Sequence, residues 1–290
     1  MELFDTAAGL SAWSDEQRVA GRTVALVPTM GALHHGHTAL ITEARRHADV
    51  VVVSIFVNPM QFNRIDDLDA YPRPIEDDLA ICRANRVEAV YAPRATAMYP
   101  PGFVTHIDPG PLADELEGAH RPGHFRGVAT VVAKLFGAAR PRVAVFGQKD
   151  FQQLTIIRRM AIDLDLGISI IVMPTVREPD GLAMSSRNRL LSPAERLAAV
   201  CVPRSLQAVA DALADGIRDA APLVAIGRSV VQAEPMARFE HLEIVHPDTL
   251  QPLAVIDDRA VAVTAVWFGE VRLIDNRLLS SVGLHPTRPS

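Results

Sequence analysis

Short apolar runs alternate with helix-like stretches along the first part of the chain. Runs rich in β-branched residues predict buried strands at 23–29, 50–57, 88–92, 142–146 and 168–176. Apolar residues at helical spacing predict helices between them, at 36–47, 76–85, 128–139 and 150–164. Continuous apolar strands that alternate with helices are typical of a parallel sheet covered on both faces.

The pattern changes after residue 192. Alanine-rich helical sequence occupies 193–215 and 222–234, and strand-like runs follow at 241–245, 260–268 and 271–276. Pro203 lies inside the first helical stretch and predicts a kink or an end there, because proline lacks the N–H that a helix interior needs. We therefore expect an α/β fold, with a doubly wound parallel sheet in residues 1–176 and a smaller α+β domain in residues 177–290.

Two stretches, 63–74 and 99–121, are rich in proline, glycine and charged residues. They predict long loops. Long loops in a compact domain often carry function or form a lid.

Composition narrows the class of protein. The chain has 290 residues, 49% apolar and 22% charged, which suits a globular protein of two domains. Its 29 Lys and Arg against 34 Asp and Glu give a formal charge of −5, which argues against a general nucleic-acid binder. The two cysteines, Cys82 and Cys201, are far apart and predict buried free thiols rather than a disulfide or a thiolate zinc site.

Targeting signals are not evident. The longest strongly apolar run, 50–57, has the length of a strand and is too short to cross a bilayer. The first residues, MELFD, lack the basic and then apolar pattern of a signal peptide. We expect a cytoplasmic protein without a membrane segment.

The turn after the first predicted strand carries the strongest chemical signal, MGALHHGH at 30–37. Gly31 and Gly36 allow close approach of the backbone, and the helix that follows presents free N–H groups and the positive end of its dipole. His34 and His37 are able to donate hydrogen bonds to phosphate oxygens there. In a nucleotidyl transfer such donors would neutralise the charge that develops on the phosphates.

Two other interpretations of the histidines stay open. Histidine is a common metal ligand, but HHGH lacks the i, i+4 spacing and the Glu of the zinc hydrolase signature. The second alternative is that the histidines are purely structural. Three histidines in four residues, framed by glycines at a strand-to-helix turn, argue against it.

Further polar groups follow other predicted elements. The P-loop signature and the dinucleotide glycine fingerprint are absent, so phosphates need other cations. FGQKD at 146–150 offers Lys149, and MSSRNR at 184–189 offers two hydroxyls and Arg187. NPMQF at 58–62 supplies Asn58 and Gln61, neutral donors that suit a small polar substrate, and Gln152 and Gln153 can reach the same crevice. Open α/β sheets bind ligands at the carboxyl ends of their strands, where several of these residues lie.

The combination resembles the pantoate–β-alanine ligase family, also called pantothenate synthetases. The matching stretches are VPTMGALHHGH (27–37), VSIFVNPMQF (53–62), DLDAYPR (67–73), ELEGAHRPGHFRGV (115–128), VFGQKDFQQL (145–154), PTVREPDGLAMSSRNRLL (174–191) and VRLIDN (271–276). The resemblance implies a Rossmann-like fold of the nucleotidyltransferase type. It also implies a two-step reaction. The carboxylate of pantoate attacks the α-phosphate of ATP to give pantoyl adenylate and pyrophosphate, and the amine of β-alanine then displaces AMP.

The resemblance also assigns roles to residues. ATP would bind Met30, Gly31, Ala32, Leu33, His34, His35, Gly36, His37, Gly147, Gln148, Lys149, Asp150, Val176, Met184, Ser185, Ser186 and Arg187. Within that set, His34, His37 and Lys149 would be catalytic. Pantoate would bind Gln61, Gln153 and Asn58, and β-alanine would also meet Gln61. Magnesium would accompany the nucleotide, with Asp77 and Asp78 as its candidate ligands.

The resemblance implies a homodimer, and it makes residues 177–290 a candidate lid over the nucleotide. Two residues depart from the family pattern. His35 stands where an acid is usual, and Gln148 stands where Glu is usual. Both flank the expected contacts, so we expect them to alter kinetics rather than abolish activity.

Three other functions remain as alternatives. Another nucleotidyltransferase would share the His-Gly turn but would not predict NPMQF and KDFQQ together. A zinc-dependent hydrolase would purify with stoichiometric zinc. A non-catalytic binding module would tolerate alanine at His37 or Lys149.

Overall fold

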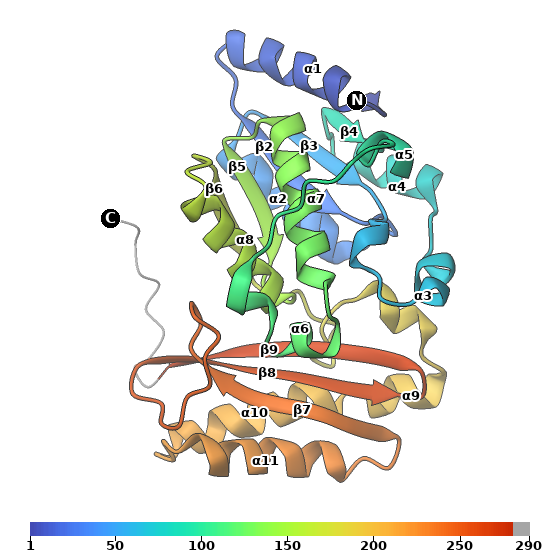
Figure 1. Cartoon of the computed structure of the whole chain (residues 1–290). Coiled ribbons are helices and arrows are strands. Elements are labelled where there is room, and N and C mark those ends of the chain that lie inside the picture. Colours follow the sequence, from blue (N-terminus) through green and yellow to red (C-terminus); the bar gives the residue numbers. More distant parts are fainter. Residues whose placement is uncertain (281–290) are drawn as a thin grey trace. The chain divides into compact units, whose positions relative to one another are not determined.

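The computed structural model describes residues 1–280, which form two compact units. The first unit contains Met1–Gln148 and Gln152–Val176. The second contains Lys149–Phe151 and the described residues from Arg177 onward. Figure 1 shows the elements of both units.

The first unit is built on a six-stranded sheet whose strand pairs are all parallel. Its strands are β1 (Glu2–Phe4), β2 (Val24–Thr29), β3 (Val50–Ile55), β4 (Ala89–Tyr91), β5 (Val143–Gly147) and β6 (Ser169–Met173). Their order is β1-β4-β3-β2-β5-β6, so the winding direction reverses between β2 and β5. The predicted doubly wound parallel sheet is confirmed. The reversal between β2 and β5 is where such sheets bind ligands.

Alternate residues of the strands fill two cores, one on each face of the sheet. Leu26 and Val52 pack with residues of α1 (Ala7–Val19), α7 (His124–Ala139) and α8 (Phe151–Asp163). Val27 and Val53 pack with residues of α2 (His35–His47) and α4 (Ile75–Ala84) on the other face. Because side chains alternate along a strand, one buried apolar run supplies both cores.

The sequence pattern missed two elements and simplified the loops. Strand β1 has only three residues, and the buried face of α1 includes Ser14 and Gln17 beside Leu10 and Trp13, so no apolar stripe marks that helix. The expected loops contain short helices, and others lie beside them: η1 (Pro59–Gln61), α3 (Ile65–Ala70), α5 (Ala95–Met98), η2 (Gly110–Ala113) and α6 (Glu117–His120).

The second unit combines helices with an antiparallel sheet, as predicted. Its elements are η3 (Ser186–Leu190), α9 (Pro193–Ala198), α10 (Cys201–Ala214), α11 (Ala220–Gln232), β7 (Ala237–Val245), β8 (Arg259–Phe268) and β9 (Val271–Ser280). The sheet order is β7-β8-β9. Leu206 and Leu223 of the helices pack in one core with Leu242 and Ile244 of β7.

The helical stretch that contains Pro203 is interrupted just before the proline. Helix α9 ends at Ala198, α10 begins at Cys201, and Pro203 is the third residue of α10. A proline in the first turn costs no intrahelical bond, because the first N–H groups of a helix have no intrahelical acceptor. The predicted kink or end is therefore confirmed: the helical run is interrupted at residues 199–200, so that Pro203 falls in the first turn of α10.

One described segment meets the length and composition criterion for a membrane span, contrary to our expectation. It is the run Pro193–Ala214, with 22 residues and a hydropathy of 1.3. Its residues Leu206, Val209 and Leu213 are buried in the core of the second unit. That burial is typical of a core helix, so the criterion is weak evidence for a membrane.

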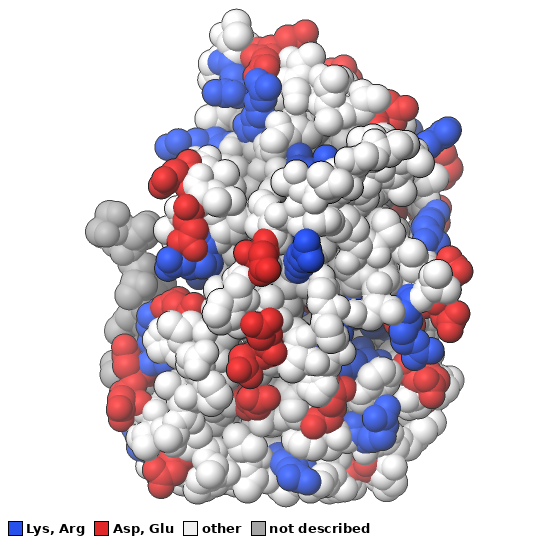
Figure 2. Space-filling model, in the orientation of Figure 1, with Lys and Arg blue, Asp and Glu red and all other residues white. Residues whose placement is uncertain are grey.

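Acidic and basic side chains are interspersed on the face of the molecule drawn in Figure 2. Both signs occur over most of that face. This distribution accords with the small formal charge of −5.

Candidate functional site

The turn between β2 and α2 begins where β2 ends, next to the reversal of the sheet order. Gly31 has φ +82° and Ala32 has φ +51°, so two consecutive residues adopt left-handed conformations. A Cβ on Gly31 would lie 2.8 Å from Asp78 Oδ2 and 3.1 Å from Ile55 Cγ2. Glycine is therefore required at position 31 both by its backbone angle and by its surroundings.

Asp78 of α4 holds this turn from the adjoining helix. Its Oδ2 accepts the N–H of Ala32 at 2.9 Å, and its Oδ1 accepts the N–H of Leu33 at 2.7 Å. The Asp78 residue is only 1% exposed. The two hydrogen bonds satisfy backbone donors of a buried turn, a use of this residue that the sequence did not predict.

His34 and His37 cap the start of α2. The N–H of Gly36 donates to His34 Nδ1 at 3.1 Å, and the N–H of His34 donates to His37 Nδ1 at 3.2 Å. A neutral imidazole whose Nδ1 accepts a hydrogen bond carries its proton on Nε2. The two rings lie 4.2 Å apart, centroid to centroid. The helix start thus sets both rings in the tautomer that makes Nε2 a donor.

Asn58 and Gln61 form one buried network in the turn after β3. Asn58 Nδ2 donates to Gln61 Oε1 at 3.0 Å and to the Gly127 carbonyl at 3.1 Å. Asn58 Oδ1 accepts the N–H of Met60 and the hydroxyl of Tyr99. Since its carbonyl oxygen faces Asn58, the Gln61 amide directs Nε2 to Met30 Sδ at 3.0 Å. The structure therefore brings Asn58 and Gln61, two of the three predicted pantoate residues, beside the predicted ATP turn.

Helix α7 and Arg121, which precedes it, hold the turn 58–62 through the backbone carbonyl of Gln61. The Gln61 carbonyl accepts His124 Nδ1 at 2.8 Å and Arg121 Nη2 at 3.0 Å. A Cβ on Gly127 would lie 2.3 Å from the Met60 carbonyl oxygen, so only glycine permits this approach. These residues had no assigned role in the sequence analysis, although they belong to the stretch ELEGAHRPGHFRGV (115–128) that carries the resemblance.

The two glutamines at the start of α8 have separate environments. Gln152 is 4% exposed, donates to the carbonyls of Leu112 and Glu115, and accepts the N–H of Glu117. Gln152 therefore supports the loop before α6. Gln153 is half-buried on the same helix and stays a predicted substrate contact.

Lys149, Ser185 and Arg187 come together within the second unit. They line one small cavity of about 10 Å³, together with Arg272 and Asp275 of β9. Ser185 Oγ accepts the N–H of Arg187 at 3.2 Å and caps η3. The structure thus joins two motifs, FGQKD and MSSRNR, that are separated in the sequence.

The stretch VRLIDN, which had no assigned role in the sequence analysis, bonds to Lys149 of FGQKD and to Arg177. Asn276 Nδ2 donates to the Lys149 carbonyl at 2.9 Å. Asp275, with a side chain 1% exposed, accepts two bonds from Arg177, at 2.7 and 3.0 Å. Such a two-pronged pair fixes the orientation of the guanidinium as well as its position.

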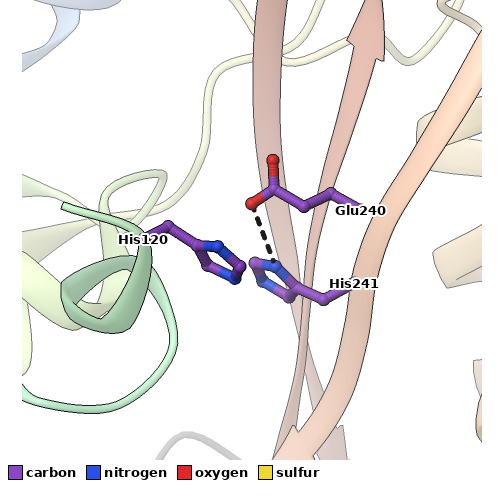
Figure 3. Close-up of side chains that lie close together, drawn as sticks. All are labelled: His120, Glu240 and His241. Atoms are coloured by element: carbon purple, nitrogen blue, oxygen red, sulfur yellow. Dashed lines mark ion pairs between the residues drawn. The ribbon is translucent and has the colours of Figure 1, made fainter.

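A bulge in β7 positions Arg272 in that cavity. The pairing of β7 with β8 shifts register between Phe239 and His241, and Glu240 lies at the shift. The Glu240 carboxylate accepts Arg272 Nε at 2.9 Å and Nη2 at 2.5 Å, and it also accepts the Trp267 indole N–H. Figure 3 shows its ion pair with His241, whose Nδ1 lies 3.6 Å away. The bulge therefore aims a carboxylate that holds Arg272 in place.

The acidic pair proposed for magnesium does not form a built metal site. Each oxygen of Asp78 already accepts a backbone N–H, and Asp77 is exposed. Magnesium prefers near-octahedral oxygen ligands and usually keeps several waters. The assignment of magnesium to Asp77 and Asp78 stays a prediction.

The predicted ATP residues divide between the two units. Met30 to His37, Gly147, Gln148 and Val176 belong to the first unit, and Lys149, Asp150 and Met184 to Arg187 belong to the second. Each group is assembled within its own unit. The role of each residue stays a prediction.

Comparisons with known proteins agree with these motifs. The family model described as pantoate-beta-alanine ligase matches residues 2–278. A pantothenate synthetase of Geotalea uraniireducens is 48% identical over 96% of this chain and 99% of its own. One of a Roseiflexus species is 52% identical over 89% and 93%.

Solved structures give the same result. A pantothenate synthetase of Thermus thermophilus has a TM-score of 0.90 and 44% identity over 96% of this chain and 99% of its own. A pantoate-beta-alanine ligase of Francisella tularensis, complexed with beta-gamma ATP and beta-alanine, has a TM-score of 0.79 and 34% identity over 96% and 97%. The chain belongs to the pantoate–β-alanine ligase family, and its reaction is the ATP-dependent ligation of pantoate and β-alanine through pantoyl adenylate.

Proposed function

We propose that the turn 30–37 binds the phosphates of ATP in the first half-reaction. Nε2 donors of His34 and His37, together with the start of α2, favour negative charge there. When the pantoate carboxylate attacks the α-phosphate, charge grows on that phosphate and on the departing pyrophosphate. Fixed donors stabilise that charge without reorganising during the reaction.

The second unit brings together cations of its own that suit phosphate oxygens in this proposal. Lys149 and Arg187 line one cavity with the Ser185 hydroxyl, and Arg272 adds a third cation held by Glu240. Arginine and lysine are suited to phosphate oxygens, arginine with two parallel donors. Gly147, Gln148, Asp150, Val176, Met184 and Ser186 would complete the nucleotide contacts.

Pantoate would bind beside the turn through the amides of Gln61 and Gln153. The observation that carries this assignment is the contact of Gln61 Nε2 with Met30 Sδ, at 3.0 Å. Asn58 would act mainly by orienting the Gln61 amide, since it donates to Gln61 Oε1. β-Alanine would then approach the adenylate near Gln61, and its amine would displace AMP.

Finer properties belong to the same proposal. Magnesium would accompany ATP, held chiefly by the phosphates of the nucleotide and by water. The enzyme would act in the cytoplasm as a homodimer, and residues 177–290 would close over the adenylate to exclude water. Closure predicts that nucleotide binding protects residues 184–189 from hydrogen exchange, and unchanged exchange would contradict it.

The decisive experiment measures pyrophosphate and AMP released from ATP with magnesium and pantoate, with and without β-alanine. We expect continuous turnover to AMP only when both substrates are present. Without β-alanine we expect one pyrophosphate per site, because the adenylate stays on the enzyme. Formation of ADP, or release that does not depend on pantoate, would contradict the proposed route.

A further inference from the structure

We infer that Asp78 is a positioning residue that holds the turn 30–37 in its phosphate-binding conformation. This inference rests on the proposed function of the turn. It assigns Asp78 to main-chain atoms of the protein rather than to a metal ion.

The hydrogen bonds of Asp78 fall on the strained part of the turn. Ala32 has φ +51°, a conformation that a residue with a Cβ adopts reluctantly. The carboxylate accepts the N–H of Ala32 and of Leu33 with one oxygen each. Hydrogen bonds to an ionised acceptor are among the strong ones, so the pair opposes relaxation of Ala32.

The turn borders a cavity at Met30 and Gly31, whereas Ala32 and Leu33 are buried, at 1% and 3% exposed. A cavity of about 390 Å³ borders the turn and is lined by Met30, Gly31, Asp78, Leu68 and Ile75, among others. Side chains that border a cavity lack packing partners on that side. Asp78 therefore bonds a turn that is packed in the core at Leu33 and open to a cavity at Met30 and Gly31.

Gly31 fits this arrangement. A Cβ at that position would lie 2.8 Å from Asp78 Oδ2, so the carboxylate and the glycine occupy adjoining space. Ala32 and Leu33 follow Gly31 in the chain, and the next residue, His34, begins the cap that sets both imidazole tautomers. A displaced turn would therefore misplace both Nε2 donors, although Asp78 touches neither phosphate nor substrate.

The first test is Asp78→Asn in the full-length enzyme, with Glu76→Gln, an exposed acid in the first turn of α4, as the matched control. An amide offers one acceptor and one donor, so one backbone N–H would face an NH₂ group. We expect kcat to fall about tenfold to a hundredfold in Asp78→Asn, as expected for misplaced reacting groups. The half-saturating Mg²⁺ concentration should stay within about twofold, since the lost interaction does not involve the metal.

A second variant separates positioning from a general loss of structure. Ala32→Gly removes the intrinsic preference of residue 32 against φ +51°. In the Asp78→Asn background we expect it to restore kcat roughly fivefold or more. Failure of this rescue, together with a large rise in the half-saturating Mg²⁺ concentration of Asp78→Asn, would overturn the inference in favour of a metal ligand.

Hydrogen exchange of the wild-type protein tests the role of Asp78 even if the variants do not fold. The amides of Ala32 and Leu33 should be protected without nucleotide and without magnesium, because their acceptor belongs to the protein. Free exchange of both amides under those conditions would overturn the inference. This measurement needs no catalytic activity, so it also distinguishes a failure of the inference from a failure of the proposed function.

Discussion

Backbone N–H groups at the start of α2 determine which nitrogen of each histidine carries the proton. His34 and His37 both accept on Nδ1, so neither needs a second side chain to select its tautomer. In many enzymes a carboxylate or a carbonyl does this for a histidine. Here backbone N–H groups within residues 34–37 select the tautomer, so the Nε2 donors depend only on the local conformation of this turn.

Removing one of these donors should weaken catalysis strongly. We expect His37→Ala to lower kcat about a hundredfold or more, the scale for loss of one transition-state donor. Single-turnover release of pyrophosphate measures the effect on the first half-reaction directly.

The matched control is His47→Ala. His47 is exposed at the other end of the same helix and pairs with Glu43. Its replacement should leave the rate within about twofold, as is usual for a surface change. Equal rates for the His37 variant and the wild type would remove the catalytic role assigned to His37.

At the scale of elements, the approach of α7 to η1 fixes the position of Gln61. Gly127 permits the contact, His124 and Arg121 bind the Gln61 carbonyl, and Asn58 links Gln61 to the helix. The position of Gln61 is thus fixed by bonds to its backbone carbonyl from residues about 60 positions later in the chain.

Two glycines of α7 provide a direct test of this packing. Gly127→Ala would place a Cβ 2.3 Å from the Met60 carbonyl oxygen, which is backbone and cannot rotate away. We expect a loss of at least about 3 kcal/mol in the free energy of unfolding, together with a raised KM for pantoate.

Gly137→Ala is the control, since nothing lies within 4 Å of its Cβ position. Alanine there should raise the free energy of unfolding by up to about 1 kcal/mol, because glycine is the poorer helix former. Urea denaturation measures both values. Similar stabilities for the two variants would show that α7 and η1 are not in close contact.

Local patterns predicted every described strand except β1, most helices and the His-Gly turn, because each depends on residues close in sequence. The pattern failed for α1, where Ser14 and Gln17 lie on the buried face. The interruption expected near Pro203 is present at residues 199–200, because the effect of proline falls on the preceding turn. Asp78 and Gly127 received no structural role from the sequence, since their partners lie 45 or more residues away or are main-chain atoms.

At the scale of the whole molecule, each unit contains one buried free thiol. Burial raises the pKa of Cys82 to about 11 and that of Cys201 to about 12. Both thiols therefore stay protonated at pH 8 in the folded protein, whereas an unfolded cysteine is partly ionised there.

We expect a thiol reagent at pH 8 to modify neither cysteine until its unit unfolds. Ionisation alone should slow the reaction roughly a hundredfold, and burial should slow it further. Because folding raises the pKa of both thiols, we also expect the free energy of unfolding to fall as pH rises above about 9, where only the unfolded thiols lose their protons. Mass spectrometry after timed labelling measures each site separately, and rapid labelling of native protein would contradict the expectation.

Residues Lys149–Phe151 belong to the second unit, which limits where the chain can be cut into separate fragments. The polypeptide passes from one unit to the other after Gln148, returns after Phe151 and passes again after Val176. A single cut near residue 176 would therefore not release two self-sufficient fragments. The amino-terminal fragment would retain Lys149 without Asn276, and the carboxyl-terminal one would lack a segment of its own packing. Because the polypeptide crosses between the units three times, the two fragments should be expressed together and tested for complementation.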